Sequence, residues 1–238
     1  MRLPRPPNSD TMARGILIAG NESTLSAAIA AEAGKRAERF AAALFPNRLS
    51  YPLENFQSKN QQPSSLVWNP GSPVSTRAMV LAAENQLGRI DDAVLVCTPP
   101  AVRKNAGDLK SADIEIIVND HIKGWFFLVK ELAVIFKAHQ AGSLALVLSD
   151  TVNGGGRDDT DLIGPSVSAS FRSLAQGLMA SSQNEPYGVY GFSIPAGTYL
   201  GTEDDNNVGA FVFKTLEDGK RNVGKWHKFG GKLTFLKH

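Results

Sequence analysis

The 238-residue chain lacks the features of secreted, membrane and metal-dependent proteins. It has one cysteine, Cys97, which excludes an internal disulfide, and no cluster of His, Cys, Asp and Glu has the spacing of metal ligands. No segment is apolar for long enough to cross a bilayer, and residues 1–11 lack the apolar stretch of a signal peptide. We therefore expect a cytoplasmic protein without a metal, and we interpret residues 1–13 as an N-terminal tail.

The chain also lacks a strong excess of charge. A net charge of +2 creates no large field that would attract nucleic acid or an anionic membrane. Residues 225–238 are locally basic with interleaved aromatics, which leaves nucleic-acid binding open, but an edge strand protected by lysines is the favoured interpretation. We expect neither a nucleic-acid nor a membrane partner.

Short apolar runs alternate with helical patterns along the chain. Residues 15–20 form an apolar run that ends in glycine, and good helix formers follow at 23–33. This rhythm predicts βαβ units and a parallel sheet. Further strands are expected at 39–45, 65–68, 92–96, 143–149, 188–194 and 233–236, and further helices at 75–87, 111–139 and 165–178.

Several segments match one known family in the right order. Leu87-Gly-Arg-Ile-Asp-Asp-Ala-Val-Leu-Val96 is similar to its Gly-x-Ile-Asp segment, and His121-Ile-Lys-Gly-Trp-Phe to its Asn-x-x-Gly-x-Phe. Gly142 to Ser149 resembles the strand that ends in a catalytic Ser. Residues 14–238 thus resemble the short-chain dehydrogenases/reductases. The resemblance implies one α/β domain, a Rossmann-like doubly wound parallel sheet with helices on both faces.

The catalytic pair of that family is missing. The stretch 165–178 resembles its Tyr-x-Ala-Ser-Lys helix, but Val167 stands for Tyr and Phe171 for Lys, and neither can transfer a proton. No Tyr-x-x-x-Lys occurs anywhere in the chain. With Leu174 and Leu178 these residues form an apolar stripe, so we expect them to pack. The remnant catalytic positions are Ser149, His121, Val167 and Phe171. For Ser149 and His121 as well, the favoured interpretation is structural.

The dinucleotide fingerprint is degraded as well. The family's Gly-x-x-x-Gly-x-Gly aligns with Gly20-Asn-Glu-Ser-Thr-Leu-Ser26, so only its first glycine remains. Pro99 and Pro100, after the expected fourth strand, have no backbone N–H to donate. Arg48 could meet a 2′-phosphate, although solvation is the favoured interpretation. The residues that the resemblance places at a cofactor are Gly20, Asn21, Thr24, Leu25, Asn69, Thr98, Pro195 and Thr198.

The helix expected at 111–139 has two apolar stripes. One contains Ile114, His121 and Trp125, and the other contains Ile122 and Phe126. A helix that is apolar on two sides needs two partners, so we expect a homo-oligomer about a two-fold axis. An internal helix is the alternative.

These observations favour a binding or scaffold protein with a degenerate active site, no NAD(P) or only weak NAD(P) binding, and an apolar small molecule as a candidate ligand. The alternative is an NAD(P)-dependent oxidoreductase that uses Ser149 with His121 or with a group not yet located. The two hypotheses differ in whether reduced nicotinamide binds at all.

Overall fold

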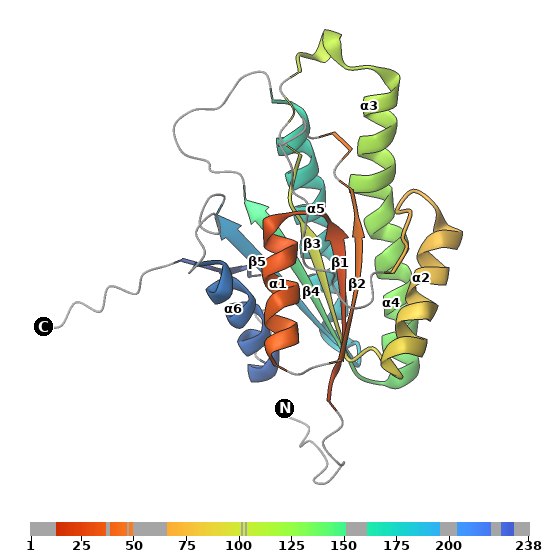
Figure 1. Cartoon of the computed structure of the whole chain (residues 1–238), viewed down its shortest axis with the longest axis vertical. Coiled ribbons are helices and arrows are strands. Elements are labelled where there is room, and N and C mark those ends of the chain that lie inside the picture. Colours follow the sequence, from red (N-terminus) through yellow and green to blue (C-terminus); the bar gives the residue numbers. More distant parts are fainter. Residues whose placement is uncertain are drawn as a thin grey trace, which may run out of the picture.

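The parallel sheet expected from the sequence is present. A computed structural model describes residues 13–36, 39–46, 48–49, 66–100, 102, 104–150, 161–195, 204–219 and 225–230. Six parallel strands follow the order β2-β1-β3-β4-β5-β6 (Figure 1). The strands are β1 Gly15–Asn21, β2 Arg39–Phe45, β3 Asp92–Cys97, β4 Ser143–Asp150, β5 Gly188–Pro195 and β6 His227–Lys228.

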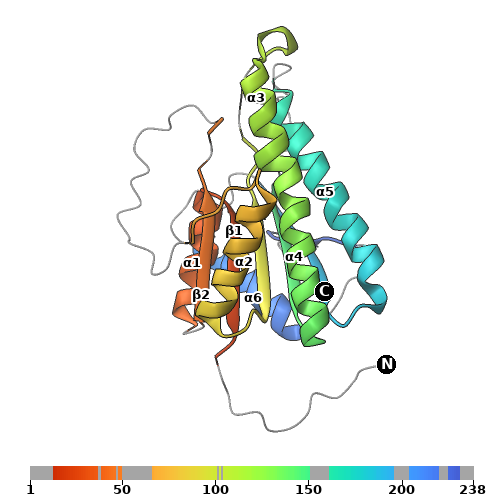
Figure 2. The same cartoon turned by 90° about the vertical axis from the view of Figure 1, so that its right-hand side faces the viewer.

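Helices cover both faces of the sheet. In Figure 1, α1 and α6 lie in front of the strands, and Figure 2 shows α2, α4 and α5 side by side over the other face. This is the doubly wound α/β arrangement that the sequence predicts. The helical segments are α1 Thr24–Lys35, α2 Pro73–Leu87, α3 Ser111–Ile116, η2 Ile117–Lys123, α4 Gly124–His139, α5 Ile163–Ser181 and α6 Asp204–Asp218, with short 3₁₀ turns η1 Ala106–Asp108 and η3 Ser182–Asn184.

The strands are buried on both sides, because successive side chains enter two different cores. Leu17 packs with the residues of α2, α4 and α5, whereas its neighbour Ile18 packs with those of α1 and α6. The same alternation separates Leu146 from Val147 on β4. This alternation determines which face of the sheet the side chain of each polar residue at a strand end points to.

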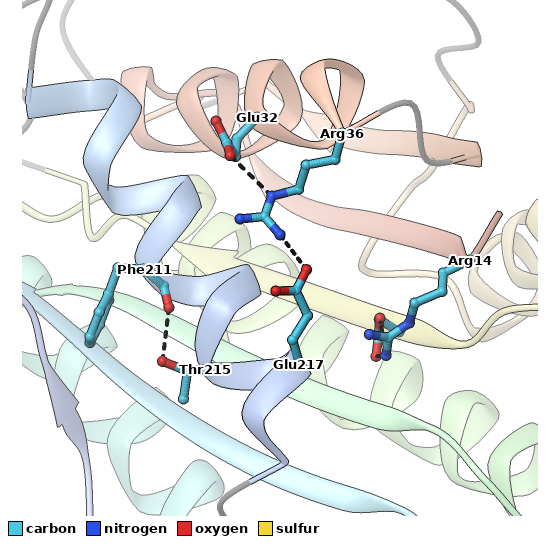
Figure 3. Close-up of polar contacts among 7 residues, drawn as sticks. Arg14, Glu32, Arg36, Phe211, Thr215 and Glu217 are labelled. Atoms are coloured by element: carbon cyan, nitrogen blue, oxygen red, sulfur yellow. Dashed lines mark hydrogen bonds and ion pairs between the residues drawn. The ribbon is translucent and has the colours of Figure 1, made fainter. Parts of the chain in front are cut away.

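The face covered by α1 and α6 is held by charge as well as by apolar contact. Arg36, which follows α1, pairs with Glu32 at 3.0 Å and with Glu217 on α6 (Figure 3). Its guanidinium also lies over the ring of Phe213. Arg14 pairs with the buried Asp92 at 2.6 Å, which joins β1 to β3 at their amino ends. Both contacts are far from the carboxyl ends of the strands, where ligands bind in such folds.

One expected strand is absent from the described residues. The prediction of a strand at 65–68 is wrong for 66–68, where Leu66 donates one hydrogen bond to the Ala42 carbonyl at 2.7 Å. The buried indole of Trp68 bonds to Thr76 on α2 at 3.0 Å, and Pro70 follows shortly after. The hydrogen bond between Trp68 and Thr76 therefore directs the chain into α2 before residues 66–68 can pair with β2 as a strand. The strand expected at 233–236 lies outside the described residues.

The long helix at 111–139 is continuous but changes its winding. Residues Ile117–Lys123 form a π-helical segment between α3 and α4. Gly124 begins α4 where its Cα approaches Pro70, since a Cβ there would lie 2.5 Å from the proline Cβ. The α3 end projects past the sheet in Figure 1, and Ile114 and Val118 are exposed. Among the described residues, no helix combines the length and the apolar character needed to cross a membrane.

Candidate functional site at the carboxyl edge of the sheet

The carboxyl ends of β1, β3, β4 and β5 bring the expected cofactor and catalytic positions to one edge. Asn21 ends β1, Thr98 follows β3, and Ser149 and Asp150 end β4. The amino end of α1 comes directly after β1. In open parallel sheets this edge is where ligands bind.

Gly20 serves strand packing. A Cβ on Gly20 would lie 2.2 Å from the carbonyl oxygen of Val96, a separation at which the backbone would have to move. Its α-carbon therefore lies against β3, its partner in the parallel ladder. Glycine is needed here because two backbones approach closely.

Asn21 and Thr98 bind each other through two hydrogen bonds. The Asn21 side-chain amide donates to the Thr98 carbonyl at 2.8 Å, and its oxygen accepts the Thr98 N–H at 2.9 Å. Asn21 is fully buried. The backbone donor and acceptor of Thr98 are thus both satisfied by Asn21, which ties the ends of β1 and β3 together.

The amino end of α1 is capped by its own serines. Ser23 Oγ accepts the Ser26 N–H at 3.1 Å, and Ser26 Oγ donates to the Asn21 carbonyl at 2.7 Å. The Thr98 hydroxyl donates to Ser23 Oγ at 3.1 Å and completes the network. We call Asn21, Ser23, Ser26 and Thr98 the polar plug. It occupies a helix amino terminus that would otherwise be suited to an anion.

The other expected cofactor residues are dispersed. Leu25 is fully buried in the core beneath α1, and Thr24 is half-buried. The Asn69 side chain accepts the Gly71 N–H at 3.2 Å, as part of the turn before α2. Pro195 ends β5, and Thr198 lies outside the described residues.

Val167 and Phe171 lie in the core. They are 0% and 1% exposed, and the Phe171 ring meets Trp125 of α4 edge to face, with ring centroids 5.1 Å apart. The buried stripe continues through Ala175 and Met179, whereas Leu174 and Leu178 are only partly buried. The expected single stripe is therefore wrong in its second half, because those two leucines turn toward the outer face of α5.

The side chains of Ser149 and His121 belong to opposite faces of the sheet. Alternation along β4 directs Ser149 to the α1 and α6 face, like Val147. His121 is fully buried on the other face, where its ring lies 5.5 Å from that of Phe45. Neither ring nitrogen of His121 hydrogen-bonds to a described residue. Desolvation lowers the pKa of His121 to about 4, so it is neutral at pH 7.

Arg48 is held by an acid within the protein. Its guanidinium makes a bidentate pair with Asp120, with Nη2 2.6 Å from Oδ2 and Nε 3.1 Å from the same oxygen. Asp120 is buried in the π-helical segment. The interpretation of Arg48 as a merely solvated side chain is wrong, and its main donors are already committed.

Sequence reasoning missed the polar group that does meet α5. Asp150, one residue beyond Ser149, accepts from Arg172 at 2.6 Å and from the hydroxyl of Ser193 at 2.6 Å. The Arg172 guanidinium lies 4.8 Å from the centre of the Trp226 ring. A signal was available: period-two alternation puts Asp150 on the α5 face and Ser149 on the other.

A shallow hollow of about 400 Å³ lies between α4 and α5. Phe126, Leu174 and Leu178 line it with small residues of α5, and Phe126 is 54% exposed. Neither the polar plug nor any other residue at the strand ends lines this hollow. Among the described residues there is no group of three or more His, Cys, Asp or Glu that could hold a metal.

Comparison with solved structures identifies the fold as that of the short-chain dehydrogenases/reductases. A short-chain dehydrogenase from Bacillus anthracis matches with a TM-score of 0.67 and 11% identity, over 90% of this chain and 94% of its own. A 3-ketoacyl-(acyl-carrier-protein) reductase from Brucella melitensis, complexed with NADH, matches with a TM-score of 0.63 and 12% identity, over 91% and 97%. No protein-family model and no curated protein sequence matches the chain.

The residues present do not fit the nicotinamide dinucleotide that this fold implies. The polar plug satisfies the Ser26 amide and both backbone groups of Thr98. Thr24 and Ser26 add side chains where the fingerprint has glycine. Ser26 is fully buried, and its hydroxyl donates a hydrogen bond to the Asn21 carbonyl. Phosphate oxygens would have to displace these internal hydrogen bonds.

Proposed function

We propose that this chain is a short-chain-dehydrogenase-like protein with a degenerate active site, which acts as a binding or scaffold protein and performs no standard hydride transfer. The observation that carries the proposal is the packing of Phe171 against Trp125 in an aromatic core, because Phe171 is the residue that the resemblance aligns with the family's Lys. Val167, one turn earlier, is also buried. The misfit of the polar plug to a dinucleotide supports the same conclusion.

A competing function is an NAD(P)-dependent oxidoreductase with other catalytic residues. It is favoured by the fold shared with a reductase that was solved with NADH. Ser149 and His121 support it poorly, because alternation and ring contacts place them on opposite faces of the sheet. A buried, neutral His121 is also a poor proton carrier.

A hydride-transfer assay distinguishes these two functions. Purified protein is incubated with NADH or NADPH and with a panel of simple carbonyl and 3-oxoacyl substrates, while the absorbance of the cofactor is followed. We expect no oxidation above the rate without protein. Protein-dependent oxidation that Ser149→Ala abolishes, and that the exposed control Ser173→Ala leaves intact, would establish the oxidoreductase.

We also propose that the scaffold role involves a second copy of the chain, which covers the hollow between α4 and α5. Phe126 and Val134 of α4 are 54% and 60% exposed, and Leu174 and Leu178 lie beside Phe126. Large exposed apolar side chains on neighbouring helices favour a protein partner over solvent. The cytosol is the proposed compartment, because the one cysteine, Cys97, is a buried free thiol and the chain therefore uses no internal disulfide.

Sedimentation tests self-association with a variant that leaves the core intact. Phe126→Glu should convert the oligomer to a monomer, whereas Lys130→Glu, which is also exposed on α4, should leave it assembled. Trp125 is unsuitable for this test because it is 1% exposed. A wild-type protein that sediments as a monomer at assay concentrations would overturn the proposal.

A further inference from the structure

The group formed by Arg172, Asp150, Ser193 and Trp226 is a second polar cluster, separate from the plug, which we call the arginine cluster. It joins α5, β4, β5 and the segment before β6. Asp150 ends β4, so the cluster lies at the carboxyl edge of the sheet on the α5 side. The proposed scaffold role does not account for the charged pair of Arg172 and Asp150 at this edge.

Arg172 is positioned but only partly used. The face of its guanidinium is 4.8 Å from the centre of the Trp226 ring, and Nη2 donates to Asp150 Oδ2 at 2.6 Å. Nε and Nη1 donate to no described residue, and the side chain is 33% exposed. A guanidinium has five N–H donors in a rigid fork that matches a carboxylate. Most of these donors therefore remain for a ligand.

Asp150 is used in the same partial way. Its Oδ2 accepts both the Arg172 and the Ser193 hydrogen bonds, whereas Oδ1 accepts none from a described residue. Ser193 thereby fixes the carboxylate, and the carboxylate fixes one end of the guanidinium. The result is an immobilised cation whose charge is only partly offset, because Asp150 is itself 27% exposed to solvent.

Two further polar groups lie near Arg172 without a partner. Ser168 is one turn before Arg172 on the same side of α5, is 8% exposed, and its hydroxyl has no hydrogen-bond partner among the described residues. The buried Trp226 Nε1 has none either. Buried polar groups are normally satisfied, so unused donors beside a partly used arginine indicate a place for acceptor atoms.

We propose that the arginine cluster is a binding site for a small organic carboxylate, which pairs with the N–H groups of Arg172 that Asp150 leaves unused. The ligand carboxylate supplies the acceptor atoms that the cluster lacks, and a hydroxyl or amino group on the ligand can donate to Asp150 Oδ1. This inference goes beyond the proposed function and does not depend on it, because no residue of the cluster belongs to the polar plug or to the oligomer face.

Ligand-observed NMR with the full-length protein tests the site. The probes are benzoate and lactate, with the neutral benzamide and lactamide as matched controls and inorganic phosphate as a second anion. We expect saturable binding of at least one carboxylate and none of its amide. Equal binding of the neutral amide, binding of phosphate alone, or no binding at all would overturn the proposal.

Two substitutions should change the affinity in opposite directions. Arg172→Gln should weaken carboxylate binding about tenfold or more, and Arg172→Lys should retain part of it. Asp150→Asn should tighten binding about threefold, because it removes the competing negative charge but keeps an oxygen that can accept from Ser193. Arg77→Gln, on the exposed side of α2, should change nothing.

Because the variants are expected to change the affinity in opposite directions, the test remains decisive if one of them is unstable. Should Arg172→Gln fail to fold, Asp150→Asn still has to tighten binding, and Ser168→Ala has to weaken it. A wild-type affinity that is unchanged in Asp150→Asn and Ser168→Ala would contradict the site. Failure here would leave the hydride-transfer assay unaffected, so the two proposals are judged separately.

Discussion

The ring of Phe171 meets the indole of Trp125 edge to face, with ring centroids 5.1 Å apart. Trp125 also lies 6.1 Å from both Phe45 and Trp68, measured between ring centroids. Phe171, which the sequence resemblance aligns with the family's Lys, is thus one end of an aromatic cluster that extends from α5 to the end of β2. Edge-to-face pairs contribute to stability beyond the area that they bury.

Restoring the family's pair should damage the fold. Val167→Tyr with Phe171→Lys places a charge in the aromatic cluster and removes a buried ring, at a cost of about 3–5 kcal/mol in the free energy of unfolding. The double variant should melt well below the parent and should gain no reductase activity. Gln176→Lys, exposed on the same helix, is the control and should melt like the parent. A stable double variant that reduces carbonyls would refute this account.

Gly20→Ala should be strongly destabilising even though it is a small change. The new methyl group would lie 2.2 Å from the Val96 carbonyl oxygen, so β1 and β3 would have to separate. We expect a loss of about 2 kcal/mol or more in the free energy of unfolding, measured by chemical denaturation. Gly107→Ala is the matched control, because no atom lies within 4 Å of the added Cβ. Equal stability of the two variants would contradict the packing role.

His121 should make stability depend on pH. Its pKa is about 4 in the folded protein and about 6.5 when unfolded, so between these values the unfolded chain binds more protons. Stability should therefore fall as the pH decreases from 7 to 5, by about 2 kcal/mol from this group alone. Denaturation of His121→Phe at both pH values should lack this decrease, whereas His139→Gln should keep it. A wild-type protein as stable at pH 5 as at pH 7 would show that the ring is hydrated.

Removing Arg48 should destabilise the protein, because the buried Asp120 carboxylate loses its partner. The acid is 2% exposed and the arginine side chain 50%, so Arg48→Ala leaves a buried carboxylate without its partner. We expect a loss of about 2 kcal/mol, part of which Asp120→Asn should recover in the double variant. A double-mutant cycle measures this coupling. Additive single losses would show that the pair contributes little.

The sequence predicted the fold well because local patterns and core alternation agree along most of the chain. The strand at 39–45 and the helices at 75–87 and 111–139 follow from apolar periodicity, which tertiary packing reinforces. The strand at 66–68 was mispredicted because the buried anchor of Trp68 on Thr76 is a tertiary contact that no local pattern reveals.

The candidate site was less predictable, because it depends on register and on contacts distant in sequence. Ser149 was identified from a motif, but the side chain that reaches α5 belongs to Asp150, and its partner Arg172 lies 22 residues away. The polar plug joins residues 75 to 77 positions apart, such as Ser23 and Asn21 with Thr98. The sequence showed that the glycines of the dinucleotide fingerprint are missing, whereas only the fold shows the hydrogen bonds of the polar plug at that place.

Titration of the protein into NADH and NADPH, with cofactor fluorescence as the signal, tests the central claim most directly. The polar plug and the side chains of Thr24 and Ser26 predict no saturable binding tighter than about 10 μM, which corresponds to about 7 kcal/mol. The variant Thr24→Gly with Ser26→Gly should bind more tightly than the parent if the plug is the obstacle. Saturable binding of either cofactor by the wild-type protein below about 10 μM would contradict the account.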